Sequence, residues 1–195
     1  MKKLAILIVP FLIASCTGSK GTQQQEQAIK EFMESYAKEH TDPDDDLTAE
    51  YDEKRDCIHM KWKCKMFNVS YDIRFKDLLT ENPTSYADGF MISMVLFFKG
   101  VTQIDRLEFV YEGIKFKMLP YTSETLNEKG VAMAGFLMSD KTSVECLKML
   151  SILSGDVTGK IYTNKGPIDI PFDDICNLRG MARSYVIDGG TFDNY

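Results

Sequence analysis

Strict alternation of apolar and polar residues between positions 57 and 76 is the strongest constraint that this sequence places on its fold. The apolar positions are first even-numbered and then odd-numbered, and lysines fill many of the positions between them. The two apolar sets are Ile58, Met60, Trp62, Cys64 and Met66, then Val69, Tyr71, Ile73 and Phe75. A period of two is typical of strands in an antiparallel sheet that buries one face and leaves the other in water.

The change of parity between the two sets predicts how these strands connect. A two-residue turn at Phe67-Asn68 would explain the change and would place Lys63 opposite Asp72. It would also pair Cys64 with Tyr71 and Trp62 with Ile73. Phe is a poor residue for such a turn, so a bulge is the alternative.

Six further segments show the apolar content or alternation of strands. They span residues 90–98, 107–111, 114–118, 131–138, 161–163 and 168–172. Phe90–Phe98 is almost wholly apolar between two glycines, which predicts a strand covered on both faces. Glu112-Gly113 predicts a tight hairpin turn that sets Glu108 opposite Lys117.

Apolar residues spaced three and four apart predict three helices. The first runs from Thr22 or Gln25 to His40, and the second from a cap at Ser139 or Asp140 to Leu153 with Cys146 in the core. The third follows a cap at Asp173 and ends at Gly189-Gly190. Its expected buried residues are Ile175, Leu178, Met181, Ala182, Tyr185 and Val186.

Together these segments predict a single α+β domain. It would hold about eight strands in a mainly antiparallel, meander-like sheet, with about three helices on one face. A half-closed barrel is the alternative. The length of 195 residues suits one domain. The net charge of −6 repels phosphate backbones, so we expect no nucleic acid partner.

The first sixteen residues have the three-part layout of an export signal. Met1-Lys2-Lys3 is positive, Leu4–Ile13 is apolar but too short to span a membrane, and small residues precede Cys16. Ile13-Ala14-Ser15-Cys16 resembles the lipobox of bacterial lipoproteins. The alternative is an ordinary signal peptide in which Cys16 is incidental.

The resemblance implies cleavage after residue 15 and a lipid with acyl chains such as palmitate on the Cys16 sulfur. The chain would then be a membrane-anchored lipoprotein of the bacterial cell envelope, and Thr17 favours the outer membrane. Residues 16–25 would form a flexible tether because they are small and polar, and residues 26–195 would form the globular domain.

The remaining cysteines are Cys57, Cys64, Cys146 and Cys176. Their spacing does not match a zinc or redox motif. Cys57 and Cys64 lie seven positions apart in one expected strand, which is too far for a disulfide between them. We expect most of the four to be buried free thiols.

An acidic segment from Asp42 to Glu53 raises the question of calcium. Six oxygen-bearing residues take the ligand positions of a twelve-residue EF-hand loop. They are Asp42, Asp44, Asp46, Thr48, Glu50 and Glu53. Leu47 replaces the glycine that such a loop needs for its sharp turn, and a solvated acidic loop is the alternative.

Motifs of catalysis are missing from the sequence. There are two histidines, His40 and His59, and no GxSxG or HExxH pattern, so we expect no enzyme, no catalytic residues and no cofactor.

The row His59, Lys61, Lys63 and Lys65 would suit an acidic partner or a polyanion, or it is simply a solvated sheet face. We expect a binding or assembly module for a protein, a glycan or a small ligand. An envelope hydrolase and a calcium-stabilised structural module are the alternatives.

Overall fold

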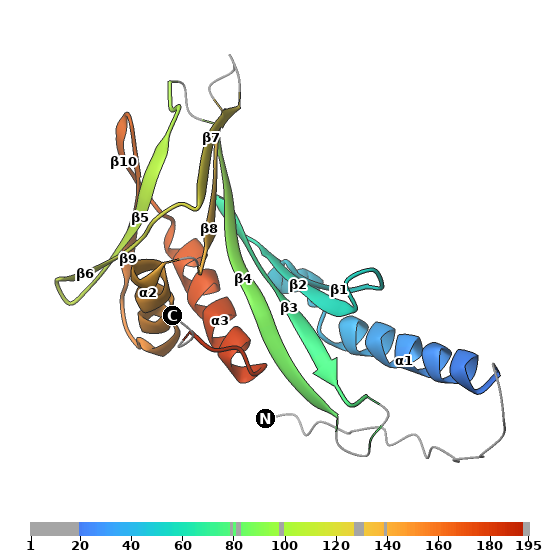
Figure 1. Cartoon of the computed structure of the whole chain (residues 1–195). Coiled ribbons are helices and arrows are strands. Elements are labelled where there is room, and N and C mark those ends of the chain that lie inside the picture. Colours follow the sequence, from blue (N-terminus) through green and yellow to red (C-terminus); the bar gives the residue numbers. More distant parts are fainter. Residues whose placement is uncertain are drawn as a thin grey trace.

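The computed structural model describes residues 20–78, 80, 83–97, 100–126, 131–138 and 140–192. Within these ranges the chain forms the predicted single α+β domain, with three α-helices and two antiparallel sheets (Figure 1). The helices are α1 (Lys20–Glu39), α2 (Lys141–Ile152) and α3 (Phe172–Ile187), and a 3₁₀ turn η1 spans Pro43–Asp45. No helix in the described part of the chain is long and apolar enough to cross a membrane.

The strands divide into a sheet of six and a sheet of four. The six-stranded sheet has the order β1-β2-β3-β4-β8-β7, and the four-stranded sheet has the order β10-β9-β5-β6. Their bounds are β1 (Leu47–Asp52), β2 (Cys57–Lys63), β3 (Phe67–Lys76), β4 (Thr84–Phe97), β5 (Ile104–Tyr111), β6 (Ile114–Met118), β7 (Thr122–Leu126), β8 (Val131–Leu137), β9 (Thr158–Thr163) and β10 (Gly166–Asp169). The prediction of one meander-like sheet is therefore wrong, because the strands form two separate sheets. The edge strands β1 and β7 are additions to the eight expected strands.

The predicted turn at Phe67-Asn68 is also wrong. β3 already begins at Phe67, and the amide of Cys64 donates to the carbonyl of Phe67, so the reversal lies at Cys64–Met66. Trp62 consequently pairs with Val69, and His59, rather than Lys63, lies opposite Asp72. The observed register differs from the predicted one by four residues. An even shift keeps every side chain on its predicted face.

The predicted hairpin between β5 and β6 is confirmed. Tyr111 pairs with Ile114 across a turn at Glu112-Gly113, and Glu108 lies opposite Lys117. Gly113 has a φ of +81°, a conformation that glycine adopts without strain.

A bulge at Gly89 determines which side chains of the central strand, β4, face the core. Ser70 pairs with Met91 and Asp72 with Asp88, so β4 holds one residue more than β3 between these pairs. Gly89 has a φ of +66°, the left-handed conformation of a glycine bulge. The extra residue changes the parity of the buried side chains, from Ala87 before the bulge to Phe90 and the even positions after it. The strand thus runs through the glycine at which the sequence predicted its start.

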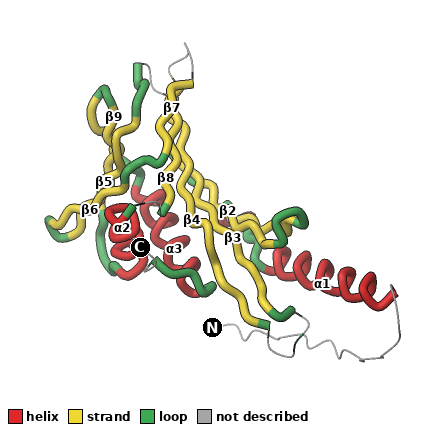
Figure 2. Tube along the Cα trace, in the orientation of Figure 1, coloured by secondary structure: helices red, strands yellow, loops and turns green. Residues whose placement is uncertain are grey.

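The helices cover one face of the six-stranded sheet. α3 contacts β3 and β4 of this sheet and β9 of the other, and α2 packs against α3 and β6 (Figure 2). α1 packs along β1 and β2. Its Tyr36 ring lies 5.0 Å from the ring of Phe75, and Tyr71, on the same face of β3, lies 5.5 Å from Tyr185 of α3.

The helix ends agree in part with the sequence predictions. Asp140 caps α2 by accepting from the amide of Ser143, as predicted. α1 begins at Lys20, so the last six residues of the expected tether 16–25 are helical. α3 begins at Phe172 after Pro171, so Asp173 is not its cap. Val186 is 46% exposed and is not part of the buried stripe.

A half-buried carboxylate joins α3 to the sheet. The Tyr71 hydroxyl donates to Asp188 at 2.6 Å, just beyond the end of α3. Burial raises the pKa of Asp188, although the bond from Tyr71 and the nearby His40 act in the opposite direction. The folded protein therefore binds the Asp188 proton more tightly than the unfolded chain does.

Replacing Gly89 tests the bulge. Gly89→Ala should lower the free energy of unfolding by about 1–2 kcal/mol, because a side chain disfavours the left-handed conformation. No atom lies within 4 Å of an added Cβ, so the loss reports on the backbone alone. Urea denaturation would measure it, with Ser93→Ala on the same strand as a control. Equal stability of the two variants would contradict the bulge conformation.

Asp188 gives a prediction about pH. A carboxyl group whose pKa is raised on folding loses stability as pH rises from its unfolded value of about 4 through its folded value. Asp188→Asn keeps an oxygen acceptor for Tyr71 but cannot ionise. We expect the stability of the wild type to fall relative to that of this variant over this pH range in urea titrations at a series of pH values. Parallel curves would contradict a raised pKa.

Candidate functional site

The six-stranded sheet has one face that no described helix covers. We call it the open face. It carries His59, Lys61 and Lys63 of β2, Asn68, Ser70, Asp72 and Arg74 of β3, Asp88, Met91, Ser93, Val95 and Phe97 of β4, and Met133, Gly135 and Leu137 of β8. The prediction that Phe90–Phe98 is covered on both faces is therefore wrong. Phe90 is 1% exposed on the helix side, whereas Phe97 on the open face is 77% exposed.

One half of the open face is a charge network centred on Asp72. His59 Nδ1 lies 2.9 Å from one oxygen of Asp72, and an Arg55 nitrogen lies 3.0 Å from the other. Arg74 lies 3.9 Å from Asp72 and donates to Asp88 at 3.1 Å. Asp72 itself is only 9% exposed, so its charge is balanced by Arg55 and Arg74 rather than by water.

A histidine bound to an aspartate is also the base of many hydrolytic sites, which need a nucleophile beside it. Cys57 lies on the same side of β2, but it is fully buried, and burial together with Asp72 raises the pKa of its thiol to about 11. The thiolate is the reactive form, so this cysteine is not activated. Among the described residues, the His59 ring forms a hydrogen bond with Asp72 and with no hydroxyl or thiol.

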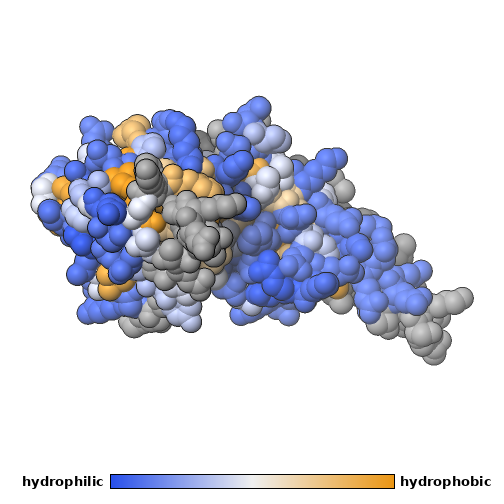
Figure 3. Space-filling model, turned by 90° about the horizontal axis from the view of Figure 1, so that it is seen from above, coloured by the Kyte–Doolittle hydropathy of each residue, from blue (hydrophilic) through white to orange (hydrophobic). Residues whose placement is uncertain are grey.

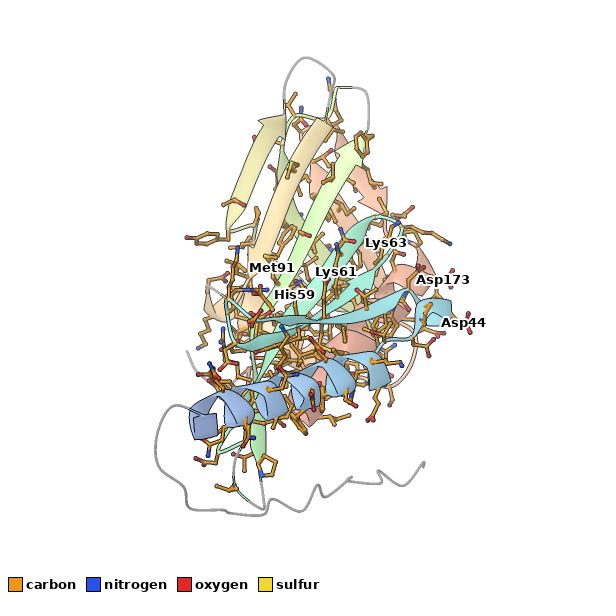
Figure 4. All side chains as sticks on the ribbon, turned by 90° about the vertical axis from the view of Figure 1, so that its right-hand side faces the viewer. Asp44, His59, Lys61, Lys63, Met91 and Asp173 are labelled. Atoms are coloured by element: carbon orange, nitrogen blue, oxygen red, sulfur yellow. The ribbon has the colours of Figure 1, made fainter. Side chains whose placement is uncertain are left out.

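The other half of the open face combines lysines with apolar side chains. Figure 4 shows His59, Lys61, Lys63 and Met91 together on the side of the sheet above α1. Lys61 and Lys63 are exposed and form no ion pair within the described part of the chain. The register places Lys61, Ser70, Met91 and Leu137 side by side across four strands.

Apolar residues continue toward the end of the sheet. Val95 pairs with Met133, and Val95 and Phe97 are 37% and 77% exposed. Seen from above, hydrophobic residues reach the surface over the sheets, whereas the part toward α1 is hydrophilic (Figure 3). Exposed apolar side chains next to charged ones are typical of protein interaction surfaces.

The structure does not gather the six residues of the predicted calcium loop. Asp42 instead caps η1, with its carboxylate accepting from the amide of Asp44. Thr48 and Glu50 lie in β1, and Glu53 lies 3.6 Å from Lys30 of α1. A strand spreads alternate side chains along its length, so these oxygens do not converge. No cluster of three or more potential metal ligands occurs within the described ranges.

The four cysteines outside the signal-like segment are free thiols. Cys57 and Cys146 are buried, as expected, whereas Cys64 and Cys176 are half-buried. Burial raises the pKa of Cys64 to about 12 and that of Cys146 further. Cys16 and the rest of residues 1–19 lie outside the described residues, so the lipidation prediction is not addressed by the structure.

Two surface cavities lie away from the open face. The larger, of about 440 Å³, lies between β6 and α2 and has Phe116 and Met149 among its lining residues, together with lysines of both elements and glutamates of α2 and β5. The second, of about 360 Å³, lies between α1 and β1. Asp188, the half-buried carboxylate with a raised pKa, lines neither of them.

Comparison of the chain with family models, with curated proteins and with solved structures finds no match. The function of the chain is therefore inferred from the geometry of the open face and from the sequence.

Sequence reasoning found the lysine row but missed its surroundings. The row does not extend to Lys65, which pairs with Asp173 beside α3 at 3.3 Å. Arg55 was missed because it lies in the β1–β2 turn, and its contact with Asp72 spans seventeen residues. Met91 was missed because a strand expected to be buried on both sides gives no reason to single out one face.

The Asp72 network yields a stability prediction. Asp72→Asn should lower the free energy of unfolding by about 1–2 kcal/mol, since it removes the charge that binds Arg55 and His59 at a nearly buried position. Asp88→Asn is the matched control. Asp88 is more exposed and pairs with Arg74 alone, so its loss should cost about 0.5 kcal/mol or less. Urea denaturation measures both, and equal effects would contradict a central role for Asp72.

Proposed function

We propose that this chain is a lipid-anchored lipoprotein of the bacterial cell envelope that binds a partner through the open face of its six-stranded sheet. The observation that supports binding is that Lys61 and Lys63, which form no ion pair within the described residues, share with the exposed apolar residues of β4 a face that no described helix covers. Exposed apolar side chains that adjoin one another and are bordered by polar residues are typical of interaction sites.

Binding is proposed rather than catalysis because the His59–Asp72 pair has no activated nucleophile beside it among the described residues. Asp72 uses both carboxylate oxygens in contacts with Arg55 and His59, which favours a structural role for the pair. The nearby thiol of Cys57 is buried and protonated.

The anchor is proposed from the sequence. A positive start, a short apolar run and the lipobox-like Ile13-Ala14-Ser15-Cys16 support cleavage and lipidation at Cys16. Two or more acyl chains at one residue give stable membrane attachment, whereas one gives only marginal attachment. Confinement to a membrane raises the effective concentration of a binding domain for partners at the same surface.

Mass spectrometry of the protein from its own cells tests the anchor. We expect a mature chain that begins at Cys16 and carries the added mass of a diacylglyceryl group, in the outer membrane fraction. Cys16→Ser should leave the precursor uncleaved, because the peptidase acts on the lipidated cysteine. A mature chain without lipid, or with Cys16 removed, would show an ordinary signal peptide instead.

A further inference from the structure

The open face shows a local imbalance of charge. The chain as a whole has more acidic than basic residues, yet the two rows that contain Lys61 and Lys63 hold no acidic residue on this face. These rows read Thr48, Lys61, Ser70, Met91 and Leu137, and Lys63, Asn68, Ser93, Gly135 and Thr122. The neighbouring row holds Glu50, Asp72 and Asp88, and of these Asp72 and Asp88 are already paired with arginines.

The positive and apolar parts of this surface have a defined spacing. β2 and β4 are separated by one strand, so the lysines of β2 lie about 10 Å from Met91 and Val95 of β4, measured across the strands. β8 adds Leu137 and Met133 about 5 Å further on. Between Met91 and Val95 the surface is hollowed, because Ser93 has a small side chain and its neighbour Gly135 has none.

We infer that the open face binds an amphipathic helix of a partner protein, with acidic residues in the first turn of that helix over Lys61 and Lys63 and apolar residues over β4 and β8. Positions seven apart on one face of a helix are separated by about 10.5 Å, which matches the spacing between the lysines and Met91. Acidic residues are favourable in a first helical turn because they complement the helix dipole. Methionines suit such a partner because their side chains adapt to its shape. This inference names the partner of the proposed binding module and so rests on that function.

Photo-crosslinking in the cells that make the full-length protein tests the inference. A benzophenone amino acid replaces Met91 in one variant and Leu137 in a second. A third carries it at Ile187, which is 81% exposed on α3 and serves as the control. Mass spectrometry then identifies the residue of the partner that is linked. We expect one protein segment for both open-face probes, acidic at its N-terminal end, with the Leu137 link three or four residues further along than the Met91 link.

A charge-reversal pair tests the part played by the lysines. Lys61→Glu with Lys63→Glu should reduce the Met91 crosslink about tenfold, because attraction to carboxylates becomes repulsion. Lys38→Glu with Lys165→Glu is the control, because it makes the same change of charge at two exposed lysines away from the open face that form no ion pair within the described residues, and it should leave the yield unchanged. Circular dichroism of the purified variants establishes that both are folded.

Several outcomes would overturn the inference. They are links from Met91 to lipid or glycan, links to a segment without acidic residues, equal yields in the two charge variants, and a yield at Met91 no greater than at Ile187. The mass at Cys16 is read from the same samples. An unlipidated Cys16 with the expected crosslinks would refute the anchor alone, whereas a lipidated Cys16 without them would refute the binding surface alone.

Discussion

The bulge at Gly89 determines which side chains of the central strand meet the helices and which meet the solvent. Before it, Ala87 faces inward, and after it Phe90 and the even-numbered residues do so. Without the extra residue, Met91, Val95 and Phe97 would face α3, and Phe90, Ile92 and Met94 would lie on the opposite face. The packing of α3 on the sheet and the composition of the open face both depend on this one residue in the left-handed conformation.

The fold class could be predicted because the local signals agree with one another. Period-two alternation in β2 and β3, the Glu112-Gly113 turn and the Asp140 cap all act over a few residues, and the structure confirms each of them. The missed edge strands had weaker signals. β1 lies in an acid-rich segment, and its pairing with β2 depends on the neighbouring strand more than on its own sequence.

The candidate site was less predictable because it depends on pairing between distant residues. A four-residue change of register decides whether Asp72 meets Lys63 or His59, and so decides that Lys63 is left without an ion pair. Asp174 is a similar case. It follows the expected cap Asp173, yet its carboxylate is buried and accepts hydrogen bonds from the amides of Lys65 and Met66, 109 and 108 residues away. Single-sequence patterns carry no information about contacts at such separations.

With the proposed lipid on Cys16, the early start of α1 would limit how far the domain could stand from a bilayer. Lys20 lies four positions after Cys16, and a fully extended chain of four residues reaches only about 14 Å. α1 would then begin close to the lipid headgroups, because the segment that joins it to Cys16 is a short linker and not a long flexible one. The domain would then sample a thin layer above one leaflet, and partners that project far from that surface would be out of its reach.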